Sequence, residues 1–265
     1  MLSVCATPIG NLEDVTLRVL RALREADVVL CEDTRHTRKL LERHGIDAKL
    51  LSYHEHNEAS RVRELVPRLQ AGERIALVSD AGLPAISDPG ARLIAAALAA
   101  DVAVTVLPGP SAVETALVAS GLVADAYSFL GFLPRRERDL RALLASLPEA
   151  PVVAFESPQR LPATLSALAE LSPERPVAVC RELTKLHEEV VRGTAAELRA
   201  RFASPPRGEI VLVLGATSAS DEPDADAARA AVDELVSAGA ARRAAAKVVA
   251  RLTGLAANRL YRDSL

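Results

Sequence analysis

Short apolar runs recur through the first half of the chain, and a segment of helical periodicity follows each one. Between the runs, apolar residues return every three or four positions, as in amphipathic helices. Fully apolar strands that alternate with helices indicate a parallel sheet covered on both faces. The predicted strands are residues 2–6, 28–31, 50–53, 74–78 and 102–106.

The second half has a different pattern. Two of its apolar runs, 177–183 and 188–193, are joined by too few residues for a helical crossover, so we expect them to pair antiparallel. Together with runs at 128–134, 152–156 and 210–214, they predict a mixed sheet. Residues 216–226 are polar and acidic, which is typical of a linker, and 227–265 predict two or three short helices.

The expected fold class is therefore α/β, with two α/β domains and a small helical C-terminal domain. We place an N-terminal domain with a parallel sheet at 1–110, a second domain with a mixed sheet at 111–216, and the linker with its helical tail at 217–265. A chain of 265 residues has ample length for such cores.

Composition excludes several classes of protein. Aromatic residues make up only 3% of the chain, which argues against a stacking platform for single-stranded nucleic acid. The net charge of −3 gives no global attraction to RNA, so any RNA contact must be local. Cys5, Cys31 and Cys180 lie in apolar runs, as small buried hydrophobes do, and their spacing suggests neither zinc nor a disulfide framework. With no apolar run of membrane-spanning length and no leader pattern, we expect a cytoplasmic protein.

The most informative stretch is Ser79–Gly90, with the sequence SDAGLPAISDPG, between a predicted strand and a predicted helix. Connections of this kind usually take two to six residues, and this one is longer and holds two aspartates and two prolines. Open α/β sheets bind ligands at the carboxyl ends of their strands. We therefore predict a ligand-binding loop; the alternative is an ordinary β–α connection built from turn residues.

Other predicted strands also end in polar residues. Residues 32–38 follow one strand, with Asp33 or Thr34 as the helix N-cap; caps and a solvated first turn are the alternative to a site. Residues 54–58 (HEHNE) follow the next strand, and we expect Asn57 to cap a helix there. His54 and His56 lack a third ligand at a suitable spacing, so we expect no metal. Residues 107–112 (LPGPSA) open a helix that can present backbone N–H groups to an anion.

Basic residues gather in two places. Arg135, Arg136, Arg138 and Arg141 follow residue 134 and are diluted by two acidic residues. From residue 240 onward there are six cations and one anion, an excess of +5. That tail resembles a small helix-turn-helix with its turn at Gly254, and a solvated helical cap explains it nearly as well.

Six motifs occur in order along almost the whole chain, and together they resemble the ribosomal small-subunit RNA methyltransferase I family of the tetrapyrrole-methylase superfamily. They are TPIGNL (7–12), EDTR (32–35), DAGxPxISDPG (80–90), PGPSA (108–112), ESPxR (156–160) and RELTK (181–185). The resemblance implies methylation of a cytidine 2′-hydroxyl in 16S rRNA, free or in the 30S subunit, with S-adenosylmethionine held between two α/β domains of a homodimer. Family members often carry Thr where Leu83 stands here.

From the resemblance and the chemistry of methyl transfer we expect three groups of residues. Those for the cofactor are Pro8, Ser79, Asp80, Ala81, Gly82, Pro84, Ile86, Ser111, Ala112 and Phe129. Those for RNA are Arg135, Arg136, Arg181, Arg242, Arg243 and Lys247. Candidates for catalysis are Glu182, Lys185 and Arg35, with Glu182 or a Lys185 of lowered pKa as the base.

Three alternatives stay open at this point. Asn11, Glu32, Asp33, Arg35, Glu156, Arg181, Glu182 and Lys185 either face the ribose and its phosphates or form salt bridges between the domains. A tetrapyrrole-precursor C-methyltransferase of the same superfamily is the rival enzyme, against which the basic tail argues. A non-enzymatic RNA-binding module is the third, against which the long loop after residue 78 argues.

Overall fold

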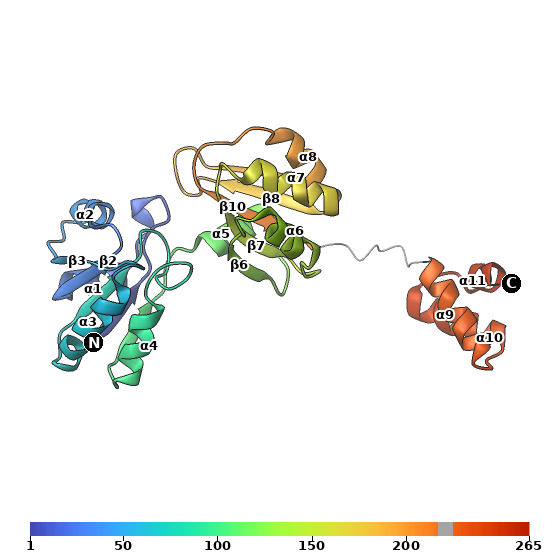
Figure 1. Cartoon of the computed structure of the whole chain (residues 1–265), viewed down its shortest axis with the longest axis horizontal. Coiled ribbons are helices and arrows are strands. Elements are labelled where there is room, and N and C mark those ends of the chain that lie inside the picture. The colour runs from blue at the N-terminus through green and yellow to red at the C-terminus, as the bar shows by residue number, and fades with distance from the viewer. Residues whose placement is uncertain (217–224, 265) are drawn as a thin grey trace. The chain divides into compact units, whose positions relative to one another are not determined.

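The apolar runs of the first half form a five-stranded parallel sheet in the order β3-β2-β4-β1-β5. Figure 1 shows the whole chain and labels β2 and β3 of this sheet. The computed structural model describes residues 1–216 and 225–264. Each strand begins and ends close to its predicted position. The strands are β1 (Leu2–Cys5), β2 (Val28–Cys31), β3 (Leu50–Ser52), β4 (Ile75–Val78) and β5 (Val104–Leu107), and the helices are α1 (Leu17–Glu25), α2 (Thr34–Arg43), α3 (Glu58–Gln70) and α4 (Ala91–Ala99).

Helices cover both faces of this sheet. Leu2 and Val4 point to the face packed by α3 and α4, whereas Cys5 on the alternate side packs with α1 and α2. This two-sided burial explains why the strands are apolar without alternation. Because all five strands are parallel, their carboxyl ends meet at one edge, where the polar segments of the sequence emerge.

The second sheet is mixed, as predicted, with the order β6-β7-β10-β8-β9. β6 and β7 are parallel, and the remaining pairs, including the predicted β8–β9 hairpin, are antiparallel. Its strands are β6 (Ser128–Phe132), β7 (Val152–Glu156), β8 (Pro176–Arg181), β9 (Glu189–Thr194) and β10 (Ile210–Leu214), with α5 (Ala112–Ser120), α6 (Glu137–Ala145), α7 (Leu161–Leu171) and α8 (Ala195–Arg201).

The turn after β1 joins the two sheets. Ile9 is 6% exposed and packs with α5 and with Leu183 and Val211 in the second half of the chain. The Asn11 N–H donates a hydrogen bond to Thr184 Oγ1 at 3.0 Å. A Cβ placed on Gly10 would lie 2.6 Å from Lys185 Cγ, so only glycine allows the turn to approach the 182–185 segment so closely.

The chain divides into two compact units, Met1–Thr217 and Ser218–Leu265, which we describe separately. The second unit contains α9 (Ala225–Ser237), α10 (Arg242–Thr253) and α11 (Ala257–Asp263) around a small core that includes Val232, Val249 and Leu260. The predicted turn at Gly254 is confirmed, with φ of 75°. Most of the predicted linker at 216–226 lies outside the described residues, which exclude 217–224. The last two residues of the predicted linker, 225 and 226, already belong to α9. The finer boundary at residue 110 stays a prediction.

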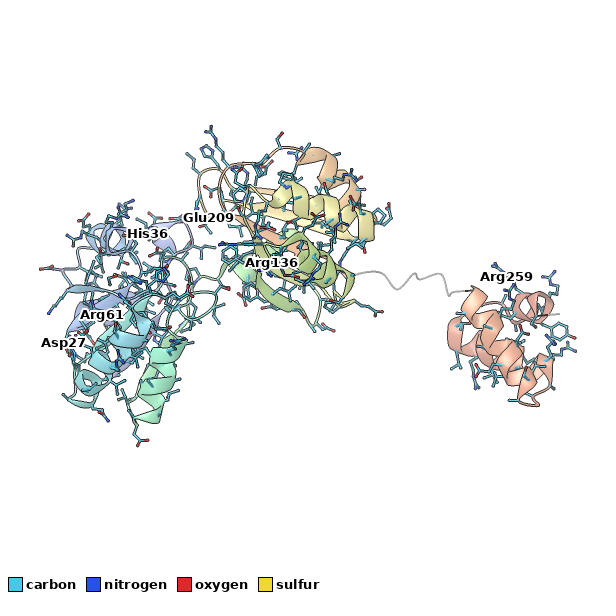
Figure 2. The ribbon with its side chains drawn as sticks, viewed as in Figure 1. Asp27, His36, Arg61, Arg136, Glu209 and Arg259 are labelled. Atoms are coloured by element: carbon cyan, nitrogen blue, oxygen red, sulfur yellow. The ribbon has the colours of Figure 1, made fainter. Side chains whose placement is uncertain are left out.

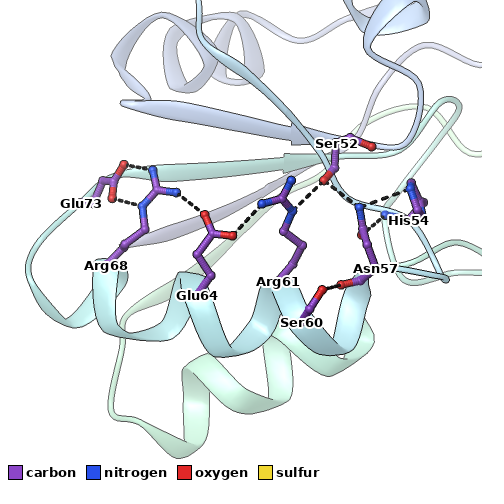
Figure 3. Close-up of polar contacts among 8 residues, drawn as sticks. All are labelled: Ser52, His54, Asn57, Ser60, Arg61, Glu64, Arg68 and Glu73. Atoms are coloured by element: carbon purple, nitrogen blue, oxygen red, sulfur yellow. Dashed lines mark hydrogen bonds and ion pairs between the residues drawn. The ribbon is translucent and has the colours of Figure 1, made fainter.

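Two local predictions met different outcomes. Asp33 caps α2 as expected, because its side chain accepts the Arg35 N–H. Asn57 occupies the N-cap position of α3 as predicted, but its side chain makes no cap hydrogen bond: its Oδ1 accepts the His54 N–H at 2.9 Å, and its Nδ2 donates to Ser52 O (Figure 3). Asn57 therefore shapes the loop before the helix instead of satisfying the first turn of α3.

The surface of α3 is stabilised by alternating charges (Figure 3). Arg61 pairs with Glu64, which pairs with Arg68, and Arg68 reaches Glu73 beyond the helix end. The Arg61 hydrogen bond holds the pKa of Glu64 below its usual range. This ladder is an ordinary helix-stabilising surface.

No helix within 1–216 or 225–264 is long and apolar enough to cross a bilayer.

Candidate active site

The segment after β4 is pinned at its start to the turn after β1. The Thr7 N–H donates to Gly82 O at 2.8 Å, and the Gly82 N–H donates back to Thr7 O at 3.0 Å. Ser79 Oγ donates to Gly82 O at 3.1 Å, and Thr7 Oγ1 donates to Ser79 O at 2.9 Å. Two sequence motifs that are far apart in the chain thus form one rigid backbone platform at the carboxyl edge of the first sheet.

The backbone of this loop is strained. Gly82 and Gly90 have φ of 78° and 140°, and the non-glycine residues Ala85 and Ser87 have φ of 73° and 62°. A left-handed conformation costs a residue with a Cβ about 1–2 kcal/mol. Strain of this kind persists only where surrounding contacts impose it, and it concentrates at functional sites. The loop therefore differs from an ordinary β–α connection.

A buried carboxylate holds the far end of the loop. Glu58, the first residue of α3, is 8% exposed, and its Oε1 accepts hydrogen bonds from the Gly90 N–H at 3.1 Å and from Tyr53 Oη at 2.9 Å. Arg92 Nε lies 3.5 Å from Glu58 Oε2. Sequence reasoning missed this residue, because nothing in a polar HEHNE stretch distinguishes the one side chain that turns inward.

Three carboxylates interact at this edge: Glu32, Asp80 and Asp88. Asp80 Oδ1 accepts the Asp33 N–H at 3.2 Å, which links the end of β2 to the end of β4. Burial, together with the charges of Glu32 and Asp80, raises the pKa of Asp88 to about 6. Burial and the charge of Asp80 also raise the pKa of Glu32. None of the three forms an ion pair within the described residues, so a cationic ligand would relieve their mutual repulsion.

Two further segments border this platform. A Cβ placed on Gly82 would lie 3.7 Å from Pro110 O, so the loop passes close to the segment that opens α5. Ser111 occupies the N-cap position of α5, but its Oγ donates to Glu114 Oε2 and not to the helix amides. Apart from the Glu114 N–H, which donates to its own carboxylate, the first-turn N–H groups are left as donors for an anion.

The strand β6 contributes the other border. Gly131 has φ of 64°, and a Cβ placed on it would lie 3.3 Å from Ser87 Oγ, so the loop and β6 approach closely. Phe129 on the same strand stacks edge-on with Phe155, with ring centroids 5.0 Å apart. Of the residues predicted for the cofactor, these contacts bring together the Thr7–Pro8 turn, the loop, the Pro110–Ala112 segment and the region of Phe129. Leu83 packs against the core of the first sheet.

Two of the three predicted catalytic residues, Glu182 and Lys185, lie on a tight turn. β8 ends at Arg181, and Glu182 and Thr184 have φ of 52° and 65°. Lys185 Nζ lies 2.9 Å from Glu182 Oε1 and 2.9 Å from Glu209 Oε2; Figure 2 labels Glu209. The chain turns here instead of continuing as an extended strand, and the turn brings Glu182 and Lys185 together.

Lys185 does not have the lowered pKa that a lysine base would need. Burial acts to lower it, but hydrogen bonds to Glu209 and Glu182 outweigh burial and raise the pKa of Lys185. The backbone N–H of Glu209 and the ammonium of Lys185 lower the pKa of Glu182. The prediction that Lys185 has a lowered pKa was therefore wrong. Lys185 and Glu182 are both charged at neutral pH, which suits them to hydrogen bonding more than to strong proton abstraction.

Several other predicted charges are paired locally and not between the sheets. Arg35 is 89% exposed at its side chain and forms a fork with Asp33, whose pKa it lowers to about 2. Arg181 pairs with Glu189 at 3.1 Å and donates to Arg207 O. These arginines stay candidates for phosphate only if RNA displaces or joins their present partners.

The expectation that Glu156 faces substrate was wrong. Its side chain is 0% exposed, lies 2.5 Å from Arg160 Nη2, and accepts hydrogen bonds from Thr164 Oγ1 and the Ser157 N–H. Arg160 in turn donates to the carbonyls of Leu133 and Pro134. The ESPxR motif is therefore a structural connection that ties β7 to the end of β6.

The predicted RNA residues are mostly exposed. Arg135 and Arg136 precede α6, and Figure 2 labels Arg136. On α10, Arg243, Lys247 and Arg251 are exposed at four-residue spacing, which places them along one face. Two members of the predicted set are paired: Arg242 lies 3.3 Å from Asp233, and Arg181 lies 3.1 Å from Glu189. Arg251 was not among the residues predicted for RNA.

The fold and the strand-edge site define the class of protein. The family profile of the tetrapyrrole (corrin/porphyrin) methylases matches residues 1–199. A crystal structure of uroporphyrin-III C-methyltransferase from Thermus thermophilus, complexed with S-adenyl homocysteine, superposes with a TM-score of 0.57 at 22% identity, covering 81% of this chain and 96% of that one. At this identity the likeness concerns the fold.

Curated relatives give a narrower assignment. Ribosomal RNA small subunit methyltransferase I of Micromonospora olivasterospora is 46% identical over 260 residues, covering 96% of this chain and 83% of that protein. The protein of the same name from Synechocystis sp. is 43% identical over 271 residues, covering 100% and 97%. The chain belongs to the ribosomal RNA small subunit methyltransferase I family.

Proposed function

We propose that this protein is an S-adenosylmethionine-dependent methyltransferase that methylates the 2′-hydroxyl of a cytidine in 16S ribosomal RNA. One observation carries the proposal furthest: the strained loop at 79–90 is held at both ends and sets unpaired carboxylates at the carboxyl edge of the sheet. In a member of this methyltransferase family, such a loop has the properties of a cofactor platform.

The residues present fit S-adenosylmethionine. The cofactor is cationic at its sulfur and its amino group, and Glu32, Asp80 and Asp88 are carboxylates without an ion pair among the described residues. Its carboxylate suits the open amides at the start of α5. When bound, the cofactor supplies an electrophilic methyl group on a positively charged sulfur. We assign binding to Pro8, Ser79, Asp80, Ala81, Gly82, Pro84, Ile86, Ser111, Ala112 and Phe129.

We assign alignment of the ribose to the turn at 182–185. A 2′-hydroxyl is a poor nucleophile at neutral pH, so its orientation and the removal of its proton are the tasks left to the protein. Lys185 is held protonated between two carboxylates, where it can donate to a ribose or phosphate oxygen. Glu182 is ionised and can accept the hydroxyl proton as the oxygen–carbon bond forms. Arg35, exposed at the carboxyl edge of the first sheet, is proposed to contact a neighbouring phosphate.

We assign the remaining RNA contacts to Arg135, Arg136 and Arg181 and to the basic face of α10, which includes Arg243 and Lys247, with Arg242 at its start. A weakly acidic protein needs such a local surface to hold a polyanion. The regular spacing on α10 favours contact with the RNA backbone over recognition of bases. Three cations in a row match a line of RNA phosphates but offer no hydrogen-bonding pattern specific for a base.

The decisive experiment supplies labelled S-adenosylmethionine with 30S particles, naked 16S rRNA or a uroporphyrinogen-type tetrapyrrole. We expect label in RNA, at a nucleotide that becomes resistant to alkaline cleavage because its 2′-oxygen is methylated. The Gly82→Val variant serves as the control for cofactor dependence. Label in the tetrapyrrole alone would support the rival C-methyltransferase, and label on a base would retain the enzyme class but refute the 2′-hydroxyl.

Three finer properties are part of the proposal: a homodimer, a cytoplasmic location and the 30S subunit as a partner. Sedimentation equilibrium of the purified chain tests the dimer, and fractionation of cells tests the location. Comparison of initial rates on 30S particles and on naked 16S rRNA distinguishes the assembled subunit from free RNA as substrate.

A further inference from the structure

A hollow of about 240 Å³ lies along α1, away from the loop that follows β4. Its lining comes from α1, from β1, β4 and β5, and from the residues just before β1 and β4. Asp27, labelled in Figure 2, lies at this amino-terminal side of the sheet, directly before β2. No residue of the 79–90 loop lines the hollow, which runs along α1 toward the amino-terminal side of the sheet.

The charged lining of the hollow is positive. Arg18, Arg21 and Arg74 line it against one acidic side chain, Glu25. Arg74 lies 3.6 Å from Asp27. Arg18 and Arg21 are exposed, and across residues 1–216 and 225–264 neither one has an ion-pair partner. Two like charges three positions apart on a helix repel each other, and a bound anion would offset this repulsion by attracting both guanidinium groups.

Neutral donors complete the lining. Ser3 on β1 and Thr105 on β5 are partners in the parallel register and both border the hollow. Within the described sheet β5 is an edge strand, so the sheet next to Thr105 is open. Paired hydroxyls beside guanidinium groups form the donor set that proteins use for phosphate oxygens.

The shape favours a chain over a small ion. The α1 residues that line the hollow, Arg18, Arg21, Ala22 and Glu25, lie on one face of the helix and span seven positions. At 1.5 Å per residue, the groove runs for about 10 Å. The helix α1 starts after the turn that carries Asn11, which contacts Thr184, so the groove leads away from the region of the proposed ribose site.

We propose that this groove is a second contact for the RNA substrate, in which Arg18 and Arg21 bind a backbone phosphate and the hydroxyls of Ser3 and Thr105 donate to it. The inference rests on the proposed function, since it takes the RNA to be the substrate. It extends that function by giving the enzyme a contact remote from the reacting nucleotide, on a face of the first sheet for which no role has been assigned.

A matched pair of variants on α1 tests the proposal. Arg21→Glu reverses a charge inside the groove. Arg24→Glu makes the same change one turn further, where the side chain donates to His44 O and does not line the hollow. We expect Arg21→Glu to raise the KM for 30S particles about tenfold and to lower the salt slope of RNA binding by about one unit, with kcat and cofactor affinity unchanged. Arg24→Glu should stay within about twofold of the wild type.

An uncharged substitution and titrations with two small phosphate ligands show whether the groove binds RNA or a small molecule. Thr105→Val keeps the β-branched shape of the edge strand, and we expect it to weaken RNA binding without a change in salt slope. Inorganic phosphate and a mononucleotide, titrated without RNA, should bind only in the millimolar range. Micromolar binding of the mononucleotide, abolished by Arg21→Glu, would overturn the RNA assignment in favour of a small-molecule site.

The outcomes separate this proposal from the function on which it rests. If the wild type fails to label 16S rRNA, both fall. If the wild type labels RNA and Arg21→Glu behaves as Arg24→Glu does, only the groove is refuted. A folded Arg21→Glu protein, checked by its thermal transition, with a raised KM and unchanged cofactor affinity would support it.

Discussion

The Glu58 carboxylate binds the Gly90 N–H at 3.1 Å and thereby joins the first residue of α3 to the last residue of the strained loop. The same oxygen accepts the Tyr53 hydroxyl, so one buried atom fixes three segments of the first sheet. Glu58→Ala would leave two buried donors without a partner, at about 1–3 kcal/mol each. We expect a loss of about 2–6 kcal/mol in the free energy of unfolding and weaker binding of S-adenosylmethionine.

Glu58→Gln is the control for that variant, because its amide oxygen can still accept both hydrogen bonds. It should retain most of the stability and most of the cofactor affinity in denaturant titration and calorimetry. If Glu58→Ala lost stability but bound the cofactor with unchanged affinity, the loop end would have no part in the cofactor site.

Gly82 lies at the bridge to Thr7 and has a left-handed φ of 78°. Gly82→Val places a β-branched side chain in that conformation, beside Pro110 O and Ile9. We expect a folded protein with greatly reduced affinity for S-adenosylmethionine, measured by calorimetric titration. Unchanged affinity in a folded variant would remove this loop from the cofactor site, and Gly82→Ala should give an intermediate loss.

Asp88 gives a pH dependence of defined sign. Its folded-state pKa is raised to about 6, so the native state binds a proton that the unfolded state has already released. Ionisation of Asp88 therefore destabilises the folded state. This cost is absent below the ordinary aspartate pKa, grows as the pH rises toward 6, and is fully present well above pH 6. Asp88→Asn removes the cost, and the variant should be more stable than the wild type at pH 7.5 by up to about 3 kcal/mol.

That difference should shrink to well under 1 kcal/mol near pH 4, where the wild-type carboxyl is protonated in the folded state and about half protonated in the unfolded state. Paired denaturant titrations of the two proteins at pH 4 and pH 7.5 measure it, and pH effects of other groups cancel in the comparison. In the same pair, we expect the cofactor affinity of the wild type to fall as pH drops through 6 and that of Asp88→Asn to be lower and flat. A wild-type affinity that does not change with pH would contradict contact between Asp88 and a cationic ligand.

The zwitterion at Glu182 and Lys185 predicts a specific defect. Lys185→Ala and Glu182→Ala should each reduce single-turnover methylation at saturating cofactor and RNA, because the ribose loses its alignment in the transition state. A general base contributes about 10²–10⁴-fold. Loss of an ionisation from the pH profile of Glu182→Ala would identify the base, whereas a defect repaired by excess RNA would indicate phosphate binding.

Glu209→Gln provides the matched control, because it removes one ion pair of Lys185 and keeps the backbone N–H that binds Glu182. We expect it to keep most of the rate. Near-normal rates for all three variants would refute the assignment and move attention to Glu32, Asp33 and Arg35 at the other sheet.

The basic face of α10 predicts a binding defect without a catalytic one. Replacing Arg243, Lys247 and Arg251 by Ala removes three exposed cations that are not needed for the small core of that unit. We expect weaker binding to 30S particles and a salt slope that is shallower by about two to three units, with unchanged cofactor affinity. Deletion of 217–265 should have the same effects, and equal 30S affinity and salt slope in the truncated protein would contradict an RNA role for the tail.

The strands were predictable because burial on both faces leaves an unbroken apolar run, and the β8–β9 hairpin because its connection is short. The features that were missed depend on contacts distant in sequence. Glu58 is buried only because Tyr53 and Gly90 converge on it.

The same limit applies to charged side chains of the candidate site. The ESPxR motif and the turn at 182–185 both place an acidic and a basic residue a few positions apart, so the sequence treats them alike. The structure separates them: Glu156 is closed off beneath α7, whereas Lys185 keeps 28% of its side-chain surface exposed. Which pair of charges can meet a substrate depends on what lies above it, and no local pattern encodes that.

The contact between the turn after β1 and the second sheet also sets an order of assembly. Asn11 and its partner Thr184 are 173 positions apart, and Ile9 packs against residues as late as Val213. At about 5–20 residues per second, a ribosome needs roughly 10–35 s to synthesise that interval. All five strands of the parallel sheet lie within the first 107 residues, so this sheet can form before the residues of the second sheet that pack against Ile9 have been synthesised. For that interval the nascent chain carries an exposed apolar turn that a chaperone can occupy, and the active site becomes complete only when the last strand is released.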